Sequence, residues 1–426
     1  PYWGGLDTAS RENLEQRLLE NDIKALVATT ALGMGFDKPD LGFVIHYQRP
    51  GSAVHYYQQI GRAGRALQQA NAILLAGAED QEIVDYFIDT AFLPESYAEE
   101  ILAVLNLAEE GLRLGEIEQQ VNLSRGRIES VLKQLAVESP APVSKLAGRW
   151  VANPVHYRRD DAKIEQLTQL RRHEQERMLA YCQGRECLMA FLQRELNDPS
   201  SGPCGRCAVC LGQPLVPERY STTIANDAAK FISSNDHPIE PRKQWPLDAL
   251  AGQGWTGAIA PELRMASGRA LCAWGDDGWG QLVRDGKASG GRFNDALVRA
   301  AAQLVRERWR PRPYPTWVTC VPSLTNPKLV PDFARRLAGA LKLRFVPCIT
   351  KTRQTAQQKT MLNSYHQARN LAGVFSVSPW RGIDGPVLLV DDMVDSGWTF
   401  TVVAATLRQA GGGPVYPLAL AVTTAG

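Results

Sequence analysis

Several features that would assign a chain to a familiar class are missing from these 426 residues. No apolar run approaches the roughly 18 residues that suggest a membrane span, so no membrane partner is expected. The net charge is only +2, from 47 Lys and Arg against 45 Asp and Glu, so the total charge indicates no particular partner. No secretory signal is present either, and we expect a cytoplasmic location.

A further absence concerns nucleotide binding. The sequence contains no G-x-x-x-x-G-K-[ST] loop and no acidic metal-binding box to accompany one. Such a loop holds nucleotide phosphates through its backbone N–H groups and its lysine, and its Ser or Thr binds Mg²⁺. The chain alone is therefore predicted not to hydrolyse ATP. Its length nevertheless favours two to four domains.

Four of the eight cysteines form one cluster with the spacing C-x16-C-x2-C-x2-C. They are Cys187, Cys204, Cys207 and Cys210. Clustered CxxC turns in a chain without a secretory signal indicate a metal site in a reducing compartment. Four thiolates satisfy Zn²⁺ in a closed tetrahedron, so a structural zinc ion is predicted. An iron–sulfur cluster is the alternative, but that motif needs a further Cys followed by Pro, and Pro214 itself stands nearby.

The other cysteines are assigned differently. Cys182 competes for the first ligand position, but it lies five residues before Cys187 and we expect it to point away from the same helical face. Cys272, Cys320 and Cys348 lie among apolar residues and are predicted to be buried.

Residues 1–95 alternate between short β-branched runs and helical stretches. Strands are predicted at 25–29, 43–47 and 72–76, and a helix at 80–90. Buried runs of this kind are typical of part of a parallel α/β sheet.

Residues 96–155 have a different pattern. Helices are predicted at 98–109, at 114–121 and after Ser124, a natural N-cap; the third has apolar residues at i, i+3, i+4 and i+7. Strands at 143–146 and 149–151 complete a winged helix. Arg125 and Arg127 lie at the start of the recognition helix, where DNA contacts usually form. The alternative is a winged helix that serves only as a protein spacer.

Two segments of residues 1–95 resemble motifs V and VI of superfamily 2 helicases, specifically the RecQ family. They are Val27-Ala28-Thr29-Thr30-Ala31-Leu32-Gly33-Met34-Gly35-Phe36-Asp37-Lys38-Pro39 and Gln58-Gln59-Ile60-Gly61-Arg62-Ala63-Gly64-Arg65. The resemblance implies the later part of a second RecA-like domain in an ATP-dependent, 3′-to-5′ DNA helicase. It implies that Thr29 and Thr30 contact the DNA backbone. It also implies that Gln58, Arg62 and Arg65 act on the ATP γ-phosphate, with Arg65 as the arginine finger, a role that suits a permanently charged guanidinium.

The cysteine spacing is also similar to that of the RecQ zinc module. In the better-known RecQ order, however, the zinc module directly follows the second RecA-like domain and the winged helix comes later. Here the winged helix comes first, so the position of the duplex-splitting element is left open.

The last two hundred residues carry another signature. Residues 387–390 form a strand-like run, which is followed by Asp391-Asp392-Met393-Val394-Asp395-Ser396-Gly397-Trp398-Thr399 and then by a helix to about residue 409. This arrangement resembles the phosphoribosyl pyrophosphate (PRPP) site of type I phosphoribosyltransferases, over residues 285–425. The resemblance implies that Asp391 and Asp392 bind the ribose hydroxyls, and that the loop binds the 5′-phosphate through Asp395, Ser396, Gly397 and Thr399.

Other residues of this region bear on the same resemblance. The Val321-Pro322-Ser323 segment follows a predicted strand at the position of a pyrophosphate loop, without an adjacent basic residue. Lys351, Arg353, Gln357, Arg369 and Asn370 resemble the flexible loop of ComF-like members. Trp398 stands where a small residue is usual. Residues 225–284 form either a hood or an interface. A domain that binds the ligand without turnover is an open alternative.

The predicted fold class is therefore multidomain α/β. It comprises a partial RecA-like parallel sheet (1–95), a winged helix (96–155), a helical zinc-binding module with four cysteine ligands (156–213) and a type I phosphoribosyltransferase-like α/β domain with an N-terminal hood (214–426). The combination resembles the bacterial RqlH-type branch of RecQ-like helicases. We expect a C-terminal piece of a longer polypeptide whose N-terminal RecA-like domain binds ATP and Mg²⁺, and whose partners are single-stranded and forked DNA in DNA repair. Two alternatives are a phosphoribosyltransferase or PRPP sensor with a DNA-binding arm, and a module that only binds DNA.

Overall fold

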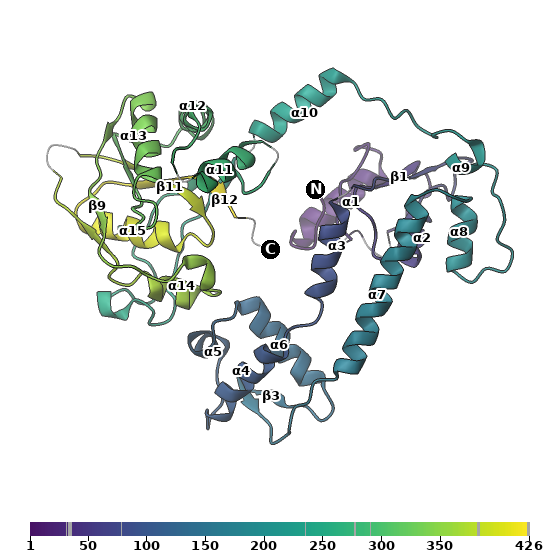
Figure 1. The fold of residues 1–426 in the computed structure, drawn as a ribbon, viewed down its shortest axis with the longest axis horizontal. Helices are drawn as coiled ribbons and strands as arrows, with labels where there is room; N and C mark the ends of the chain where they lie inside the picture. Colours follow the sequence, from purple (N-terminus) through teal and green to yellow (C-terminus); the bar gives the residue numbers. More distant parts are fainter. Residues whose placement is uncertain are drawn as a thin grey trace. The chain divides into compact units, whose positions relative to one another are not determined.

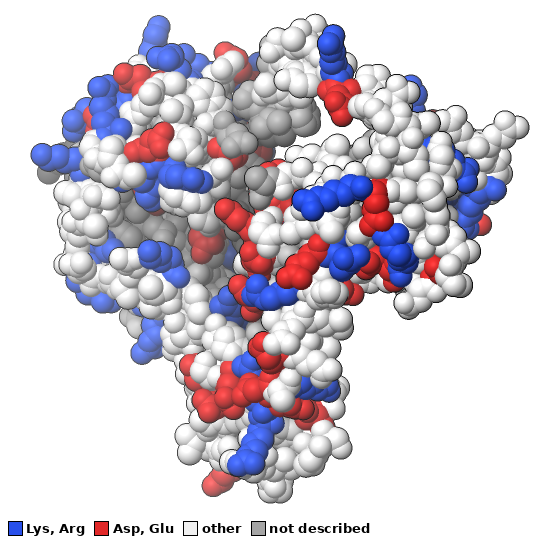
Figure 2. Space-filling model, turned by 45° about the vertical axis from the view of Figure 1, so that its right-hand side comes forward, with Lys and Arg blue, Asp and Glu red and all other residues white. Residues whose placement is uncertain are grey.

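The structure, a computed structural model, describes residues 1–30, 32, 36–77, 79–234, 236–276, 278–289, 291–380 and 384–423 (Figure 1). The chain forms two compact units, one of Pro1–Leu93 with Arg158–Tyr220 and the other of Pro94–Tyr157 with Ser221–Gly426. Charged side chains of both signs are interspersed over the face drawn in Figure 2. None of the described helices is both long enough and apolar enough to span a bilayer.

The first unit contains a small parallel sheet in which β1 (Phe43–His46) pairs with β2 (Asn71–Leu74). Its helices are α1 (Thr8–Leu19), α2 (Ala53–Ile60) and α3 (Asp80–Asp89). The strand predicted at 25–29 is wrong, since only a single bridge joins Ala28 to Tyr2. The physical reason is the short partner: the chain turns at Gly4 and Gly5, immediately beyond Trp3, so no ladder can extend.

The helices α7 (Asp161–Cys182), α8 (Leu188–Glu195) and α9 (Ala208–Leu211) belong to the same unit. Tyr56 of α2 packs with Met178 of α7 and Phe191 of α8 in one buried cluster. A buried polar contact supports this packing, because Arg49 donates through Nε to Oε1 of Gln175 at 3.1 Å. The zinc-region helices therefore complete the core of the N-terminal segment, a long-range contact that the sequence pattern does not predict.

The second unit begins with the helical segment 94–157. It contains α4 (Glu95–Asn106), α5 (Leu114–Gln120), α6 (Arg125–Val137) and the antiparallel pair β3 (Val143–Leu146) and β4 (Arg149–Ala152). The predicted apolar stripe of α6 is buried, and its members are Ile128, Val131, Leu132 and Leu135. Ser124 caps α6 by accepting the N–H of Arg127. The three helices and the strand pair predicted for this segment are thus present in the predicted order.

The rest of the second unit is built on a six-stranded sheet with the order β5-β6-β12-β11-β7-β8. These strands are β5 (His237–Ile239), β6 (Gly268–Ala273), β7 (Trp317–Cys320), β8 (Arg344–Phe345), β11 (Val387–Val394) and β12 (Val415–Val422). All are parallel except β5. A separate antiparallel pair joins β9 (Ile349–Lys351) to β10 (Phe375–Val377).

Helices cover both faces of this sheet. Leu388 and Val390 of β11 pack with α12 (Asp295–Gln303) and α13 (Leu329–Leu341) on one face. Leu389 packs with α15 (Trp398–Gln409) on the other. The described part also contains α10 (Thr222–Ser234), α11 (Trp279–Ala288), α14 (Ser364–Asn370), 3₁₀ turns at Ala251–Gln253 and Gln358–Thr360, and a π-helical turn at Leu304–Trp309. The strand order reverses between β11 and β7, and in open α/β sheets ligands bind at the carboxyl ends of the strands at such a switch point.

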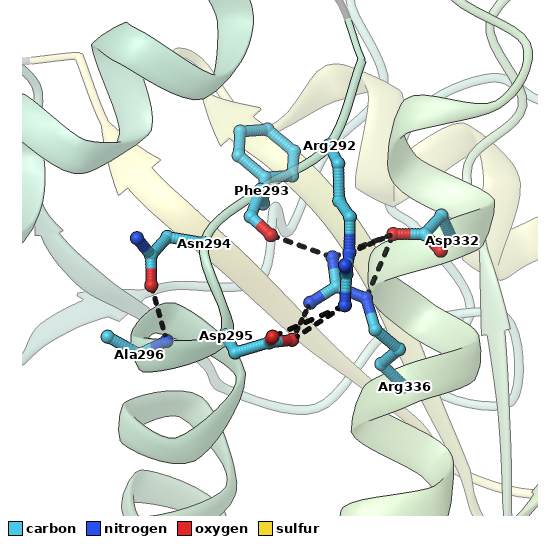
Figure 3. Close-up of polar contacts among 7 residues, drawn as sticks. All are labelled: Arg292, Phe293, Asn294, Asp295, Ala296, Asp332 and Arg336. Atoms are coloured by element: carbon cyan, nitrogen blue, oxygen red, sulfur yellow. Dashed lines mark hydrogen bonds and ion pairs between the residues drawn. The ribbon is translucent and has the colours of Figure 1, made fainter.

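An ion-pair network joins α12 to α13 (Figure 3). Arg336 lies 2.7 Å from Asp295 of α12 and 2.7 Å from Asp332 on its own helix, and it also donates to the Phe293 carbonyl at 2.8 Å. Arg292 reaches Asp295 at 2.9 Å. Both guanidinium groups are therefore neutralised by carboxylates within the fold.

Candidate functional site

The two helicase-like segments lie against each other in the first unit. Arg62 donates through Nη1 to the carbonyl of Phe36 at 3.1 Å. Arg65 pairs through Nη1 with Oδ1 of Asp37 at 2.8 Å. The fold therefore places both arginines beside the end of the segment that contains Thr29 and Thr30. Ala31 and residues 33–35 of that segment lie outside the described residues.

The arginine at the candidate finger position is accessible. The Arg65 side chain is 48% exposed and its partner Asp37 is 59% exposed. Exposed pairs of this kind contribute about 0–1 kcal/mol, so exchanging Asp37 for a phosphate costs little. Gln58, Thr29 and Thr30 are also exposed. These side chains can therefore reach a ligand without disturbing the core.

A neighbouring lysine was not singled out from the sequence. Lys38 is buried, and its Nζ donates to Oδ1 of Asp40 at 2.6 Å and to the carbonyl of Leu19 at 3.4 Å. Hydrogen bonds from Lys38 and Asn21 lower the pKa of Asp40 to about 2. These contacts hold the end of the first helicase-like segment against the end of α1. The only signal for this role in the sequence is a lysine two residues before an acid.

The four predicted zinc ligands are brought together. The Sγ atoms of Cys187, Cys204, Cys207 and Cys210 all lie within 4.8 Å of one another. Tetrahedral zinc with bonds of about 2.3 Å requires sulfurs about 3.8 Å apart, and Cys187 and Cys207 are separated by 4.0 Å. The donor set and its spacing therefore fit a closed structural site.

Helix starts position two of these thiols. Cys187 is the N-cap of α8 and Cys207 is the N-cap of α9, so both sulfurs accept backbone N–H groups. Cys182, which was expected to point away from the helical face of Cys187, is separated from it by a helix end: Cys182 is the last residue of α7, and Gly184 with φ of +58° precedes α8. Cys182 does not belong to the described cluster.

The thiols of the cluster differ in pKa. Burial raises the pKa of Cys187, but N–H groups of Ala190 and Cys204 outweigh that effect and lower it to about 6. An N–H of Gly205 lowers the pKa of Cys210, whereas the neighbouring sulfurs of Cys207 and Cys187 raise it to about 11 overall. Four sulfurs this close cannot all ionise without a cation between them, which is the chemistry that Zn²⁺ supplies.

The acid pair of the second unit lies in the second half of β11, where the strand order reverses. Asp391 accepts the N–H of Asp392 through Oδ1 at 2.8 Å, and Asp392 pairs with Lys287 of α11 at 2.8 Å. Burial and the charge of Asp392 raise the pKa of Asp391 above its usual range. The strand continues to Val394, so the acids lie in the strand and not in the loop that follows.

The loop before α15 is bound by a side chain from the segment that precedes β6. Arg242 donates through Nε and Nη2 to the Ser396 carbonyl at 3.0 and 2.6 Å, and its guanidinium carbon lies 5.3 Å from the Trp398 ring. Trp398 stacks on Trp245 at 6.2 Å, and Trp245 stacks on Trp255 at 4.9 Å. Burial lowers the pKa of Arg242. The unusual tryptophan therefore packs against residues 242–255, and Arg242 is a residue that the sequence did not reveal.

The remaining loop residues have distinct positions. Asp395 accepts the Thr423 hydroxyl through Oδ1 at 2.9 Å. Gly397 has φ of +79°, a conformation that favours glycine, and it caps α15. Thr399 lies in the first turn of α15 and is partly exposed. The backbone N–H groups at the start of this helix can donate hydrogen bonds to a phosphate.

The predicted DNA contacts of α6 are engaged within the protein. Arg125 lies 3.3 Å from Glu118 and 3.4 Å from Glu129, although its side chain is 62% exposed. Arg127 lies over the Tyr97 ring, 5.8 Å from its centre. The side chains of Arg125 and Arg127 are themselves exposed, so both guanidinium groups remain accessible to DNA phosphates.

The turn before α6 packs on the sheet-containing part of the same unit. Asn363 is 4% exposed and donates to the carbonyls of Glu118, Val121 and Leu123 at 3.0, 2.9 and 3.0 Å. Asn122 donates in return to the Thr360 carbonyl at 2.8 Å. The helical segment 94–157 is thus connected to the region around residues 357–366 by the buried Asn363 amide and by the exposed Asn122 amide.

Comparison with known proteins agrees with the first of these sites. Residues 1–67 match the family described as the helicase conserved C-terminal domain. The ATP-dependent DNA helicase RecQ of Synechocystis is 32% identical over 232 residues, which cover 49% of this chain and 43% of the relative. RecQ of Bacillus subtilis is 38% identical over 88 residues, which cover 21% of this chain and 15% of the relative.

Other similarities are shorter or weaker. The probable ATP-dependent DNA helicase RecS of Bacillus subtilis is 35% identical over 109 residues, covering 26% of this chain and 22% of the relative. The solved structure of the Mycobacterium smegmatis helicase Lhr bound to single-stranded DNA and AMP-PNP covers 36% of this chain and 23% of its own, with 20% identity. Its TM-score of 0.18 is too low for a shared arrangement to be inferred. The chain spans less than half the length of these curated relatives, and it is similar to the C-terminal portion of RecQ-like superfamily 2 helicases.

Proposed function

We propose that this chain supplies the C-terminal part of an ATP-dependent DNA helicase of the RecQ type, which moves 3′ to 5′ along single-stranded or forked DNA. The observation that carries the proposal is the contact of Arg62 and Arg65 with Phe36 and Asp37, since it joins the two helicase-like segments within the region that matches a helicase family. In this proposal Arg65 stabilises the charge that develops on the γ-phosphate, while Arg62 and Gln58 position it.

The nucleotide itself is bound by a second RecA-like lobe of the same polypeptide, which provides the phosphate-binding loop and the Mg²⁺ ligands. Exposed apolar side chains of the first unit support such a partner surface. Phe43 is 40% exposed, Ile45 is 51% exposed and Tyr47 is 80% exposed, all in or beside β1. Contiguous apolar exposure of this kind usually marks an interface.

DNA contacts are assigned to two places. Thr29 and Thr30 contact the backbone of the tracked strand, and Arg125 and Arg127 contact the duplex from α6 of a winged helix. Zn²⁺ held by the four cysteines stabilises the fold beside the first unit's core and takes no part in hydrolysis. The proposed location is the cytoplasm, where these thiols remain reduced.

ATP hydrolysis separates this proposal from a chain with its own nucleotide site. The 426 residues alone should release no phosphate from ATP with single-stranded DNA present, because no phosphate-binding loop is encoded. The polypeptide that includes the nucleotide-binding lobe should hydrolyse ATP and unwind a 3′-tailed fork. DNA-stimulated hydrolysis by the 426 residues alone would overturn the proposal.

A second function is favoured by the end of β11 and the loop that leads into α15. Asp391 and Asp392 lie near the carboxyl end of β11, and the following loop leads into the start of α15. We propose that this site binds PRPP, with the acids on the ribose hydroxyls and residues 395–399 on the 5′-phosphate. Whether transfer follows binding is a separate question for a product assay.

Calorimetric titration with PRPP and Mg²⁺ tests this site. Asp391→Asn and Asp392→Asn should each remove most of the binding heat, because ionised oxygens no longer accept the ribose hydroxyls. Asp384→Asn is the matched control, since Asp384 is an exposed acid just before the amino end of β11. Equal heats for all four proteins would exclude the site while leaving the helicase proposal untouched.

A further inference from the structure

The charge of this chain is unevenly distributed, although its total is small. Residues 221–426 carry 24 Lys and Arg against 15 Asp and Glu, whereas residues 1–220 carry 23 against 30. The C-terminal part is thus strongly basic and the remainder is acidic. On the face drawn in Figure 2, Lys and Arg side chains outnumber Asp and Glu over the left-hand body, which contains the six-stranded sheet.

Some of this charge is neutralised within the fold. Arg292 and Arg336 are paired with Asp295 and Asp332 in the network of Figure 3. Arg269 pairs in the same way with Asp236 at 2.9 Å. Basic side chains with such partners are structural.

One group of basic residues has no such partners. Its members are Arg306, Arg310, Arg312, Lys342 and Arg344, and all five are exposed. Among the described residues, no carboxylate lies within 4.0 Å of a charged nitrogen of Arg310, Arg312, Lys342 or Arg344. Within the described part of the chain, Arg306 likewise has no carboxylate within 4.0 Å and donates to a backbone oxygen, the carbonyl of Ala340. These charges are available to an external anion.

The fold gathers these five residues at one edge of the sheet. Arg344 begins β8 and lies opposite Trp317, which begins the parallel strand β7. Arg310 ends the π-helical turn, and the short segment through Arg312 leads directly into β7. Lys342 ends α13, the helix whose last turn Arg306 contacts. The group therefore lies at the amino ends of β7 and β8, the end of the sheet opposite the acid pair of β11.

We propose that this edge, formed by Arg306, Arg310, Arg312, Lys342 and Arg344, is a second nucleic-acid surface that binds the phosphate backbone of DNA. Four of the five are arginines, whose planar guanidinium groups match phosphate oxygens in pairs. Tyr314 is 42% exposed between Arg312 and β7, where a base can stack on it. It is the only large apolar side chain exposed in the described segments 306–316 and 340–346, which disfavours a membrane surface.

The physical consequence is salt dependence. Each phosphate contact releases condensed counterions, so five contacts contribute about −3.5 to the slope of log K against log salt on single strands and about −4.5 on duplex. This contribution to the slope is independent of ATP and of the proposed PRPP site. It adds to any contacts made by Arg125 and Arg127.

The test compares two variants that lose the same charge. Arg312→Gln with Arg344→Gln removes two members of the surface, whereas Lys328→Gln with Lys359→Gln removes two exposed charges that do not belong to it. Fluorescence anisotropy with labelled oligo(dT) and with a duplex of equal length, across a salt series without ATP, gives the slopes. Thermal unfolding checks that both variants fold.

The surface variant should reduce the slope by about 1.4 on single strands or about 1.8 on duplex, and the control should leave it unchanged. The arm with the larger loss of affinity identifies the preferred strand form. Equal changes in both variants would show a general charge effect and overturn the proposal, as would no change in either. Lost binding to phosphatidylserine vesicles with unchanged oligonucleotide binding would assign the edge to a membrane instead.

Discussion

The six-stranded sheet of the second unit and the β1–β2 sheet of the first unit differ in how far their strands are covered by other elements. In β11 of the second unit, Val387, Leu388, Leu389 and Val390 are all fully buried between helices. In β1 of the first unit, Ile45 is 51% exposed and Phe43 is 40% exposed. The difference indicates that the six-stranded sheet is covered by its own core, whereas the described part of the first unit leaves apolar side chains of β1 uncovered.

The two units also obtain their stability differently. The first relies on a small cluster around Tyr56 and Met178 and on the cysteine site, while the second buries two extensive clusters on the faces of its sheet. Small cores commonly need a metal or a partner surface to remain folded. The comparison therefore predicts separate unfolding of the two units, with separate sensitivities.

The largest expected effect follows from loss of the metal. Cys204→Ser should abolish zinc binding and unfold the region of α7–α9, because structural zinc sites contribute on the order of 10 kcal/mol. The second unit should unfold at its original temperature. Metal content by mass spectrometry and calorimetric unfolding provide the measurement. Cys182→Ser is the control, and loss of zinc in that variant would show that the cluster is misassigned.

A pair of core substitutions tests the comparison of the sheets directly. Leu389→Ala removes a fully buried side chain of β11 and should cost about 2–5 kcal/mol of unfolding free energy. Ile45→Ala removes a half-exposed side chain of β1 and should cost under about 1 kcal/mol. Urea titrations that resolve each unit give both values. Equal losses would contradict the difference in burial.

A smaller effect is expected at the contact between the two parts of the second unit. Asn363→Asp keeps the oxygen that accepts the His366 N–H but removes the donors to three carbonyls. Unsatisfied buried groups should cost about 1–3 kcal/mol and speed amide exchange in residues 117–124. Asn370→Asp, in the same region but away from this contact, should leave that exchange unchanged. Fast amide exchange of residues 117–124 in both variants would show that the hydrogen bonds of Asn363 do not stabilise this contact.

The smallest effect is pH dependence at the same contact. Burial lowers the pKa of His366, against an opposing effect of the Val121 backbone. The unfolded chain therefore takes up the proton first, so this contribution is present above about pH 6.5 and is lost as pH falls toward the folded pKa. Because this side chain is only partly buried, the change should stay below about 1 kcal/mol. Unfolding titrations of His366→Gln should show a shallower loss than the parent; an identical loss would exclude this histidine.

The local patterns of the sequence predicted much of this structure. The apolar spacing of α6 and the run from β11 into α15 are both found where the residues indicate them. The cysteine spacing correctly grouped four sulfurs. These predictions succeed because each depends on neighbours within a few residues or on a motif with fixed geometry.

Long-range packing was not accessible from the same patterns. Arg49 and Gln175 are 126 residues apart, and only the folded chain reveals that they share a buried hydrogen bond. Arg242 reaches the Ser396 carbonyl across 154 residues. The basic residues around Arg344 come from two segments of the chain. The net charge of +2 gives no indication of them. Tertiary contacts decide these positions, so periodicity and composition carry no signal for them.

The central claim is that a guanidinium from the first unit acts on a nucleotide held elsewhere in the polypeptide. Single-turnover ATP hydrolysis by Arg65→Ala, made in the polypeptide with the nucleotide-binding lobe, tests it most directly. We predict that the rate falls by about a thousandfold or more with little change in ATP affinity, because the arginine acts mainly in the transition state. The control Arg17→Ala, an exposed arginine paired with Asp22, should hydrolyse normally. Equal rates for Arg65→Ala and Arg17→Ala would contradict the account.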